Sequence, residues 1–288
     1  MSLFTDCHWH SRDGLKLHYR DYGGPEGLPA DRPTVLCLHG LTRNARDFEG
    51  LAEALAGQWR IIVPEMRGRG DSGYAKDSAS YNPLQYAEDL GALFEQAAID
   101  RVVAIGTSLG GLLTMILAMT DPDRIAAAAL NDVGPEIDPG GIERIRGYVG
   151  QGRSFPTWMH AARALEESQG HAFPDFEIAN WLAMAKRCMT LGSNDRVVFD
   201  YDMKIAEPFE QSGDAGVDLW PAIDALAGKP VLILRGELSD ILSEATLARM
   251  RERLPGAETV TIPQVGHAPT LDEPEARAAI QRLLARLA

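Results

Sequence analysis

The sequence predicts an α/β domain in which a mostly parallel central sheet is flanked by helices on both faces. Short apolar runs bounded by turn residues recur along the chain, and stretches with helical patterning lie between them. Such runs are typical of strands that are buried on both faces of a sheet. With 288 residues, of which 45% are hydrophobic and 24% charged, the chain is long enough to bury a sizeable core.

The elements of this domain follow in order from about residue 8 to residue 135. The segment LKLHYRDYG alternates polar and apolar residues, which predicts a half-exposed strand. The expected central strands are TVLCL at 34–38, RIIVP at 60–64, RVVAIG at 101–106 and IAAAAL at 125–130. Helical stretches such as 81–98 separate them. Strands and helices that alternate in this way indicate a mainly parallel sheet.

The pattern is interrupted after the strand at 125–130 and resumes about a hundred residues later. The intervening segment is rich in aromatic residues but has no comparable apolar run. The alternation resumes with a strand at 230–236, a helix at 243–254, a strand at 258–263 and a helix at 273–288. We therefore expect a core domain formed by 1–133 and 218–288, with a helical lid, or cap, inserted at 134–217.

Charge and composition exclude several classes of partner. The formal net charge of −13 argues against a nucleic-acid partner, which requires clustered Lys and Arg. The first residues do not resemble a secretory signal, and no apolar stretch approaches the roughly 18 residues that a membrane span needs. The three scattered cysteines Cys7, Cys37 and Cys188 suit free thiols in a reducing compartment. We expect a cytoplasmic protein without a membrane partner.

The stretch GTSLGG at 106–111 follows one expected strand and precedes an expected helix. It matches the G-x-S-x-G pattern in the strand–turn–helix context that gives this pattern meaning. Gly106 and Gly110 would relieve crowding at a sharp turn, so that Ser108 projects above the carboxyl ends of the strands. The N–H of Leu109 would face the same point and donate to an oxyanion. The alternative is that Ser108 is an ordinary helix N-cap.

A nucleophilic serine needs a base, and the base needs an orienting acid. His267 is the histidine in a loop between the last expected strand and the last expected helix, at the carboxyl end of the sheet. Asp240 follows the strand at 230–236, and its loop can turn toward the loop of His267. We therefore expect a triad of Ser108, Asp240 and His267. Glu237 and Asp132, which also end strands, are the alternatives for the acid.

Several spaced motifs in this order resemble those of the α/β-hydrolase superfamily. They are LHG at 38–40, PEMRGRGDSG at 64–73, GTSLGG at 106–111, NDVGP at 131–135, RGELSD at 235–240 and VGH at 265–267. Glu65 stands where that family usually has Asp. The resemblance implies an α/β-hydrolase fold, a lid inserted after the sixth strand, and an oxyanion hole completed by the N–H of Leu41. Some members place the acid after the sixth strand, where Asp132 lies.

The resemblance also implies an activity. Ser108 argues against the dehalogenases and epoxide hydrolases of this fold, which carry Asp at that position. We expect a serine hydrolase that cleaves a carboxylic ester or lactone of a small to medium, mainly apolar substrate through an acyl-enzyme. The cap aromatics Phe155, Trp158 and Trp181 are expected to line its pocket. The alternatives are a hydrolase of activated carbon–carbon bonds and a non-catalytic receptor for a small ligand.

Three other features of the sequence are candidate sites. Residues 68–73 match G-x-G-x-x-G, but loop residues follow where a dinucleotide site needs a helix, so no cofactor is expected. Alternation along CHWH at 7–10 places Cys7 opposite His8 and His10, so no metal site is expected there. Arg43 is interpreted as a solvated loop residue, with contact to a substrate carboxylate as the alternative. The sequence leaves open whether the protein is a monomer or a homodimer.

Overall fold

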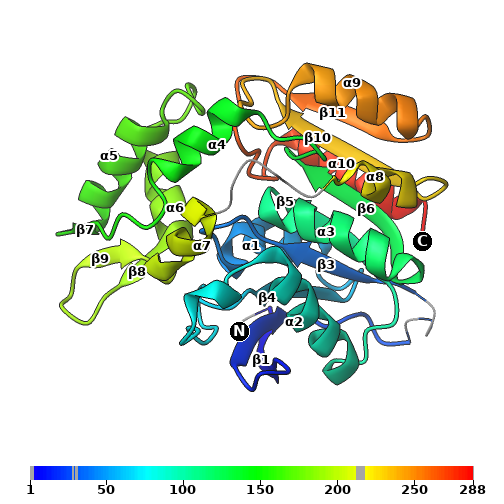
Figure 1. Ribbon diagram of the computed structural model, residues 1–288, viewed down its shortest axis with the longest axis horizontal. Helices are drawn as coiled ribbons and strands as arrows, with labels where there is room; N and C mark the ends of the chain where they lie inside the picture. Colours follow the sequence, from blue (N-terminus) through cyan, green and yellow to red (C-terminus); the bar gives the residue numbers. More distant parts are fainter. Residues whose placement is uncertain (1–2, 28, 30–31, 212–217, 288) are drawn as a thin grey trace.

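The computed structural model describes the chain apart from residues 1–2, 28, 30–31, 212–217 and 288. Its centre is an eight-stranded sheet with the strand order β1-β2-β4-β3-β5-β6-β10-β11 (Figure 1). The strands are β1 (Thr5–His10), β2 (Lys16–Asp21), β3 (Thr34–Leu38), β4 (Ile61–Glu65), β5 (Val102–Thr107), β6 (Ile125–Asn131), β10 (Val231–Gly236) and β11 (Glu258–Ile262). From β4 to β11 the neighbouring strands are parallel, whereas β1 and β2 are antiparallel. The predicted fold class is confirmed.

Helices cover both faces of this sheet. They are α1 (Glu49–Leu55), α2 (Pro83–Gln96), α3 (Leu109–Thr120), α8 (Trp220–Ala225), α9 (Glu244–Arg253) and α10 (Pro274–Ala285). Helices α2, α3, α8 and α9 pack in one core layer and α1 and α10 in the other. Successive side chains of β3 serve both layers, because Leu36 and Leu38 enter the first while Val35 and Cys37 enter the second. This two-sided burial explains the uninterrupted apolar runs of the central strands.

The segment between β6 and α8 forms the cap, which contains a small sheet as well as helices. Its elements are α4 (Pro139–Arg146), β7 (Ser154–Phe155), α5 (Trp158–Gln169), α6 (Ile178–Cys188), β8 (Met189–Leu191), β9 (Val197–Phe199) and α7 (Ala206–Gln211). The three strands pair antiparallel in the order β7-β9-β8. Strands of two or three residues are too short to give a periodic signal, so the sequence predicted only helices. The expected end of the cap at residue 217 lies outside the described residues.

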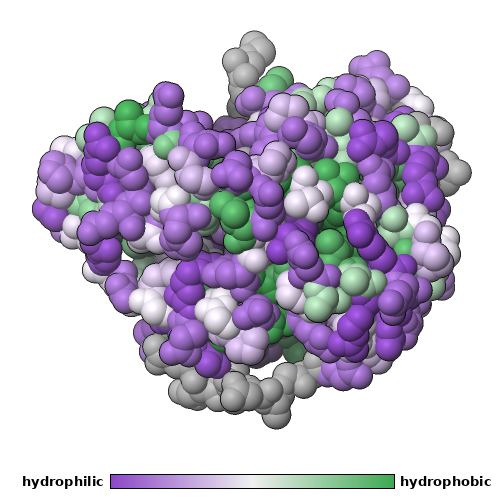
Figure 2. Space-filling view, turned by 90° about the horizontal axis from the view of Figure 1, so that it is seen from above, coloured by the Kyte–Doolittle hydropathy of each residue, from purple (hydrophilic) through white to green (hydrophobic). Residues whose placement is uncertain are grey.

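Arginine ion pairs join the cap to the core domain. Arg46 of the core contacts Asp200 of the cap at 2.5 Å, and Arg187 and Arg144 of the cap contact carboxylates of the core. Figure 1 shows α5, α6 and the small sheet gathered at one side of the core domain. The surface seen in Figure 2 is largely hydrophilic, with apolar side chains in separate patches. Within the described residues, no helix is long and apolar enough to span a bilayer.

Candidate active site

Ser108 occupies the sharp turn between β5 and α3. Its backbone lies at φ 52° and ψ −115°, a region that residues other than glycine rarely adopt. A Cβ on Gly106 would lie 2.3 Å from the carbonyl oxygen of Gly110, and one on Gly110 would lie 2.0 Å from that of Leu38. Both glycines are therefore required by close approach of the backbone, as the sequence predicted. The side chain of Ser108 makes no N-cap hydrogen bond to α3.

The hydroxyl of Ser108 is linked to His267 and, through it, to Asp132. The distance from Ser108 Oγ to His267 Nε2 is 2.9 Å, and that from His267 Nδ1 to Asp132 Oδ2 is 2.8 Å. The side chain of His267 is 8% exposed and that of Asp132 is fully buried. A buried carboxylate at Nδ1 keeps the proton on that nitrogen and leaves Nε2 free to accept from the serine.

Asp132 is held by hydrogen bonds on both carboxylate oxygens. Oδ1 accepts from the N–H of Gly236 at 2.9 Å, and Oδ2 accepts from the hydroxyl of Ser239 at 2.7 Å in addition to His267. The backbone of Asp132 is left-handed, with φ 56°, directly after β6. Because β6 lies between β5 and β10 in the sheet, Asp132 sits between the strand that carries the serine and the strands before the histidine loop.

The structure does not bring Asp240 to His267, contrary to the contact that the sequence predicted. Asp240 faces the cap instead and accepts two hydrogen bonds from Arg144, from Nε at 2.5 Å and from Nη2 at 2.7 Å. Burial raises the pKa of Asp240, but the hydrogen bond and charge of Arg144 outweigh it and keep the pKa below its usual range. A cation on an inserted segment determines where this carboxylate points, and the loop sequence alone carries no sign of it.

Leu41 and Leu109, the residues expected to form an oxyanion hole, flank Ser108. Leu109 is the first residue of α3, so its N–H has no acceptor within the helix. Leu41 lines the same pocket as Ser108, and a Cβ on the preceding Gly40 would lie 3.8 Å from Ser108 Cβ. Buried His39 fixes this loop, because its Nδ1 donates to the Gly40 carbonyl at 2.7 Å and its Nε2 accepts from the N–H of Met66 at 3.0 Å.

The pocket above Ser108 lies between the core and the cap. Of the three aromatics predicted to line it, Phe155 does so, whereas Trp158 and Trp181 are absent from its described lining. Trp181 is 1% exposed and packs edge to face against Phe173 and Phe176, so it belongs to the interior of the cap. Aromatic composition could not distinguish these roles. Lining residues that the sequence did not indicate are Tyr148, Phe173, Met184, Cys188, Phe199 and Tyr201.

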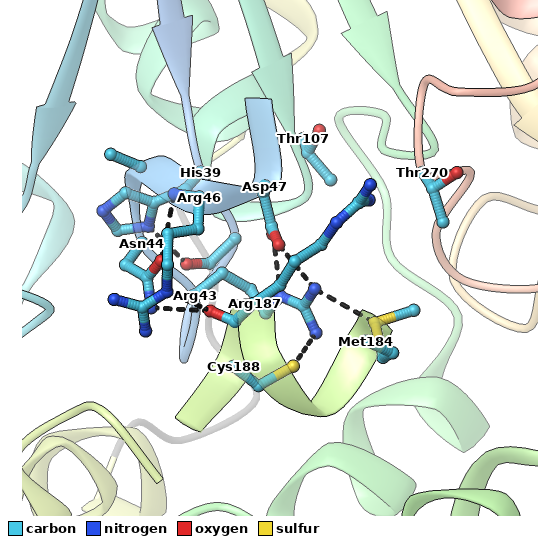
Figure 3. Close-up of polar contacts among 12 residues, drawn as sticks. His39, Arg43, Asn44, Arg46, Asp47, Thr107, Met184, Arg187, Cys188 and Thr270 are labelled. Carbon is cyan, nitrogen blue, oxygen red and sulfur yellow. Dashed lines mark hydrogen bonds and ion pairs between the residues drawn. The ribbon is translucent and has the colours of Figure 1, made fainter. Parts of the chain in front are cut away.

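Arg43 is a half-buried residue of this pocket and is not a solvated loop residue. Its guanidinium forms a two-point ion pair with Asp47, with distances of 2.7 and 2.5 Å. The far side of the guanidinium faces sulfur, with Cys188 Sγ at 2.6 Å and Met184 Sδ at 3.1 Å (Figure 3). Burial raises the pKa of the Cys188 thiol to about 11, so the sulfur accepts as a neutral thiol.

The glycine-rich segment at 68–73 is a loop that passes beneath the cap. A Cβ on Gly70 would lie 2.2 Å from the carboxylate of Glu65. Glu65 accepts from the N–H groups of Ala45 and Asp71 and contacts His18 Nδ1 at 2.9 Å. Among the described residues, one group of side chains has ligand atoms close enough together to hold a metal ion. It consists of His18, Glu65 and Asp71. Since hydrogen bonds already connect them, the cluster is explained as a brace between β2, β4 and this loop.

Comparison with known proteins agrees with the fold. Residues 33–274 match the family described as alpha/beta hydrolase fold. The chain belongs to the α/β-hydrolase family. An α/β-hydrolase structure from Novosphingobium aromaticivorans is 64% identical to this α/β-hydrolase, covers 99% of both chains and has a TM-score of 0.94. The 3-hydroxybutyrate-oligomer hydrolase of Cupriavidus necator is 34% identical over 90% of this chain and 89% of its own. The 2-(acetamidomethylene)succinate hydrolase of Mesorhizobium japonicum is 27% identical over 82% and 81%.

Proposed function

We propose that this α/β-hydrolase is a serine esterase with Ser108 as nucleophile, His267 as base and Asp132 as orienting acid. The observation that carries the proposal is the continuous hydrogen-bonded series from Ser108 Oγ through His267 to the buried carboxylate of Asp132. The position of Ser108 in a strained strand-to-helix turn, beside the amides of Leu41 and Leu109, supports the same role.

In the proposed reaction, Ser108 Oγ attacks the ester carbonyl while His267 Nε2 takes the hydroxyl proton. The resulting oxyanion accepts from the N–H groups of Leu41 and Leu109, and Asp132 stabilises the imidazolium. The tetrahedral species collapses when His267 returns the proton to the leaving alkoxide, which departs as an alcohol. A water molecule then attacks the acyl-enzyme, with His267 again accepting and returning a proton, and the acid is released.

For the substrate we propose a short aliphatic ester, with oligomers of a hydroxy acid as the leading class. The name of the Cupriavidus necator relative supports this class, since oligomers of 3-hydroxybutyrate are linear esters. The pocket supports it as well, because Ile145, Phe155 and Phe199 offer apolar surface while several arginines lie among them. Positive charge in the pocket wall favours a substrate that carries a polar or anionic group beside its apolar chain.

The proposal is tested by labelling with a fluorophosphonate probe and by ester hydrolysis. We expect one adduct per chain, on Ser108, and turnover of 4-nitrophenyl acetate and of the 3-hydroxybutyrate dimer. Ser108→Ala should abolish labelling and lower ester turnover by roughly 10⁴-fold or more, because the members of a triad act as a unit.

Ser168, a second serine of the pocket lining, provides the matched control. Its hydroxyl donates to backbone carbonyls of its own helix α5, so Ser168→Ala should leave labelling and turnover nearly unchanged. An adduct on Ser168, or full activity of folded Ser108→Ala, would contradict the proposal. A wild-type protein that neither labels nor turns over any ester would favour a non-catalytic receptor.

A further inference from the structure

The pocket above Ser108 concentrates positive charge in an otherwise acidic protein. The chain carries a formal net charge of −13, yet four arginines and one carboxylate are in the described lining of this pocket. The arginines are Arg43, Arg144, Arg153 and Arg187, and the carboxylate is Asp47. A concave site with cations in its walls raises the local concentration of anions and favours an anionic ligand.

Two of these arginines are neutralised one to one. Arg43 is paired with Asp47 through two hydrogen bonds and directs its remaining edge at sulfur atoms. Arg144 is paired with Asp240 through two hydrogen bonds. In a two-point pair, the carboxylate occupies the edge of the guanidinium to which an anionic ligand would otherwise bind. Arg153 lies at the exposed rim, where its guanidinium stands 5.6 Å from the ring centre of Phe155.

Arg187 differs from the other arginines because its counter-ion is shared. It reaches Asp272 through Nη2 alone, and Asp272 also accepts from Arg277 Nη2 at 2.7 Å. The two cations and one carboxylate leave a net positive charge beside the pocket. Within the described part of the chain, Nε and Nη1 of Arg187 have no hydrogen-bond partner, and the side chain is 22% exposed. Donors on a guanidinium that face a cavity are suited to a carboxylate.

Arg187 lines the pocket of Ser108 from the side of the cap. It is the penultimate residue of α6 in the cap, whereas Ser108 belongs to the core domain, and both line the same pocket. Figure 3 shows its side chain running away from Cys188 toward the side on which Thr107 and Thr270 lie. The backbone carbonyl of Arg187 is fixed by Asn44 Nδ2 at 3.0 Å and Arg46 Nε at 3.1 Å. The arginine therefore projects into the pocket from a fixed backbone.

We propose that Arg187 binds a carboxylate of the substrate, so that the preferred esters carry a free carboxylate away from the scissile bond. This inference rests on the proposed esterase function and specifies the substrate class of the same site. The carboxylate would accept from one of the unused donors of Arg187, Nε or Nη1, which lie on opposite sides of the guanidinium, while Asp272 stays paired with Arg277. Since this end of the substrate takes no part in bond cleavage, its contact holds the ground state and the transition state alike.

The test compares two substrates that differ in charge but hardly in shape. They are the dimer of 3-hydroxybutyrate with its free terminal carboxylate and the same dimer with a terminal carboxamide, each with the full-length protein. We expect the wild type to prefer the free acid in kcat/KM. Arg187→Gln should lower kcat/KM for the acid roughly 10- to 100-fold, mostly through KM, as loss of a hydrogen bond to a charged group predicts. The amide should be affected little.

Asp272→Asn is the matched control, because it breaks the same contact between cap and core but leaves the cation. If Arg187 binds the substrate carboxylate, this variant keeps the preference for the acid or increases it. Arg277 continues to pair with Asp272 in Arg187→Gln, so that variant is expected to fold, which circular dichroism and the melting temperature check. Arg187→Lys should retain part of the preference, since it keeps the charge but loses the planar fork.

Three results would overturn the inference. In the first, the wild type hydrolyses both dimers equally. In the second, Arg187→Gln and Asp272→Asn lose activity on both dimers to the same extent, which would make the arginine only a structural contact of the cap. Both of these leave the esterase function standing. In the third, neither dimer, nor 4-nitrophenyl acetate, nor the fluorophosphonate reacts with the wild type, and then the proposed function itself fails.

Discussion

The replacement of Asp132 by Asn is the most informative single change in the proposed triad. The carboxylate of Asp132 accepts three hydrogen bonds, from the N–H of Gly236 on Oδ1 and from Ser239 and His267 on Oδ2. An asparagine has one oxygen and one NH₂ group, so it cannot accept on both sides. With its NH₂ toward His267, the imidazole must accept at Nδ1 and carry its proton on Nε2. That tautomer cannot accept the proton of Ser108.

The opposite orientation of the amide also has a cost. The oxygen would then face His267, but the NH₂ group would meet the N–H of Gly236, and two donors would face each other in a fully buried site. We therefore expect Asp132→Asn to raise the activation free energy by about 4 to 5.5 kcal/mol, equivalent to a loss of about 10³- to 10⁴-fold in turnover. The unsatisfied buried group should lower the free energy of unfolding by about 1 to 3 kcal/mol.

The assay is kcat/KM for 4-nitrophenyl acetate, with Asp240→Asn as the control. The carboxylate of Asp240 is 38% exposed, and among the described residues its ion-pair partner is Arg144 of the cap. A partly exposed ion pair contributes about 0.2 to 1 kcal/mol to stability. This variant should therefore keep its activity within a few-fold and melt close to the wild type. If Asp240→Asn instead lost about 10³-fold while a folded Asp132→Asn remained active, the assignment of the acid to Asp132 would be refuted.

Two further predictions concern the cap and a buried histidine. Phe155→Ala should change the ratio of kcat/KM between short and long acyl esters by roughly 10-fold or more, because Phe155 lines the pocket. Trp181→Ala should mainly lower the free energy of unfolding, by about 3 to 5 kcal/mol, because Trp181 is buried inside the cap. Equal shifts in acyl preference for the two variants would contradict this separation. Burial lowers the pKa of His39 from 6.5 to about 4, so the unfolded chain binds a proton below pH 6.5 that the folded protein excludes. The free energy of unfolding should thus fall by about 3 kcal/mol from this group as the pH drops from 6.5 to 4, and denaturant titrations of His39→Gln should show a shallower fall than the wild type.

The sequence by itself determined the core architecture and the place of the proposed nucleophile. Strands buried on both faces must be apolar throughout, so 34–38, 60–64, 101–106 and 125–130 could be located to within a residue or two. The turn at Ser108 leaves no room for side chains at Gly106 and Gly110, which is a local constraint and hence visible in a local motif. The position of His267 in the loop after the last strand follows from chain order in the same way.

The tertiary structure decided which carboxylate meets His267 and what the pocket presents to a ligand. Asp132, Glu237 and Asp240 all follow strands, and their separation in sequence says little about direction. Arg144, which lies 96 residues before Asp240, draws that carboxylate toward the cap, while the neighbouring Ser239 donates to Asp132. The charge of the pocket likewise depends on long-range partners. Whether Arg187 is neutralised depends on how Asp272 is shared with Arg277, and this is fixed only when the cap packs on the core.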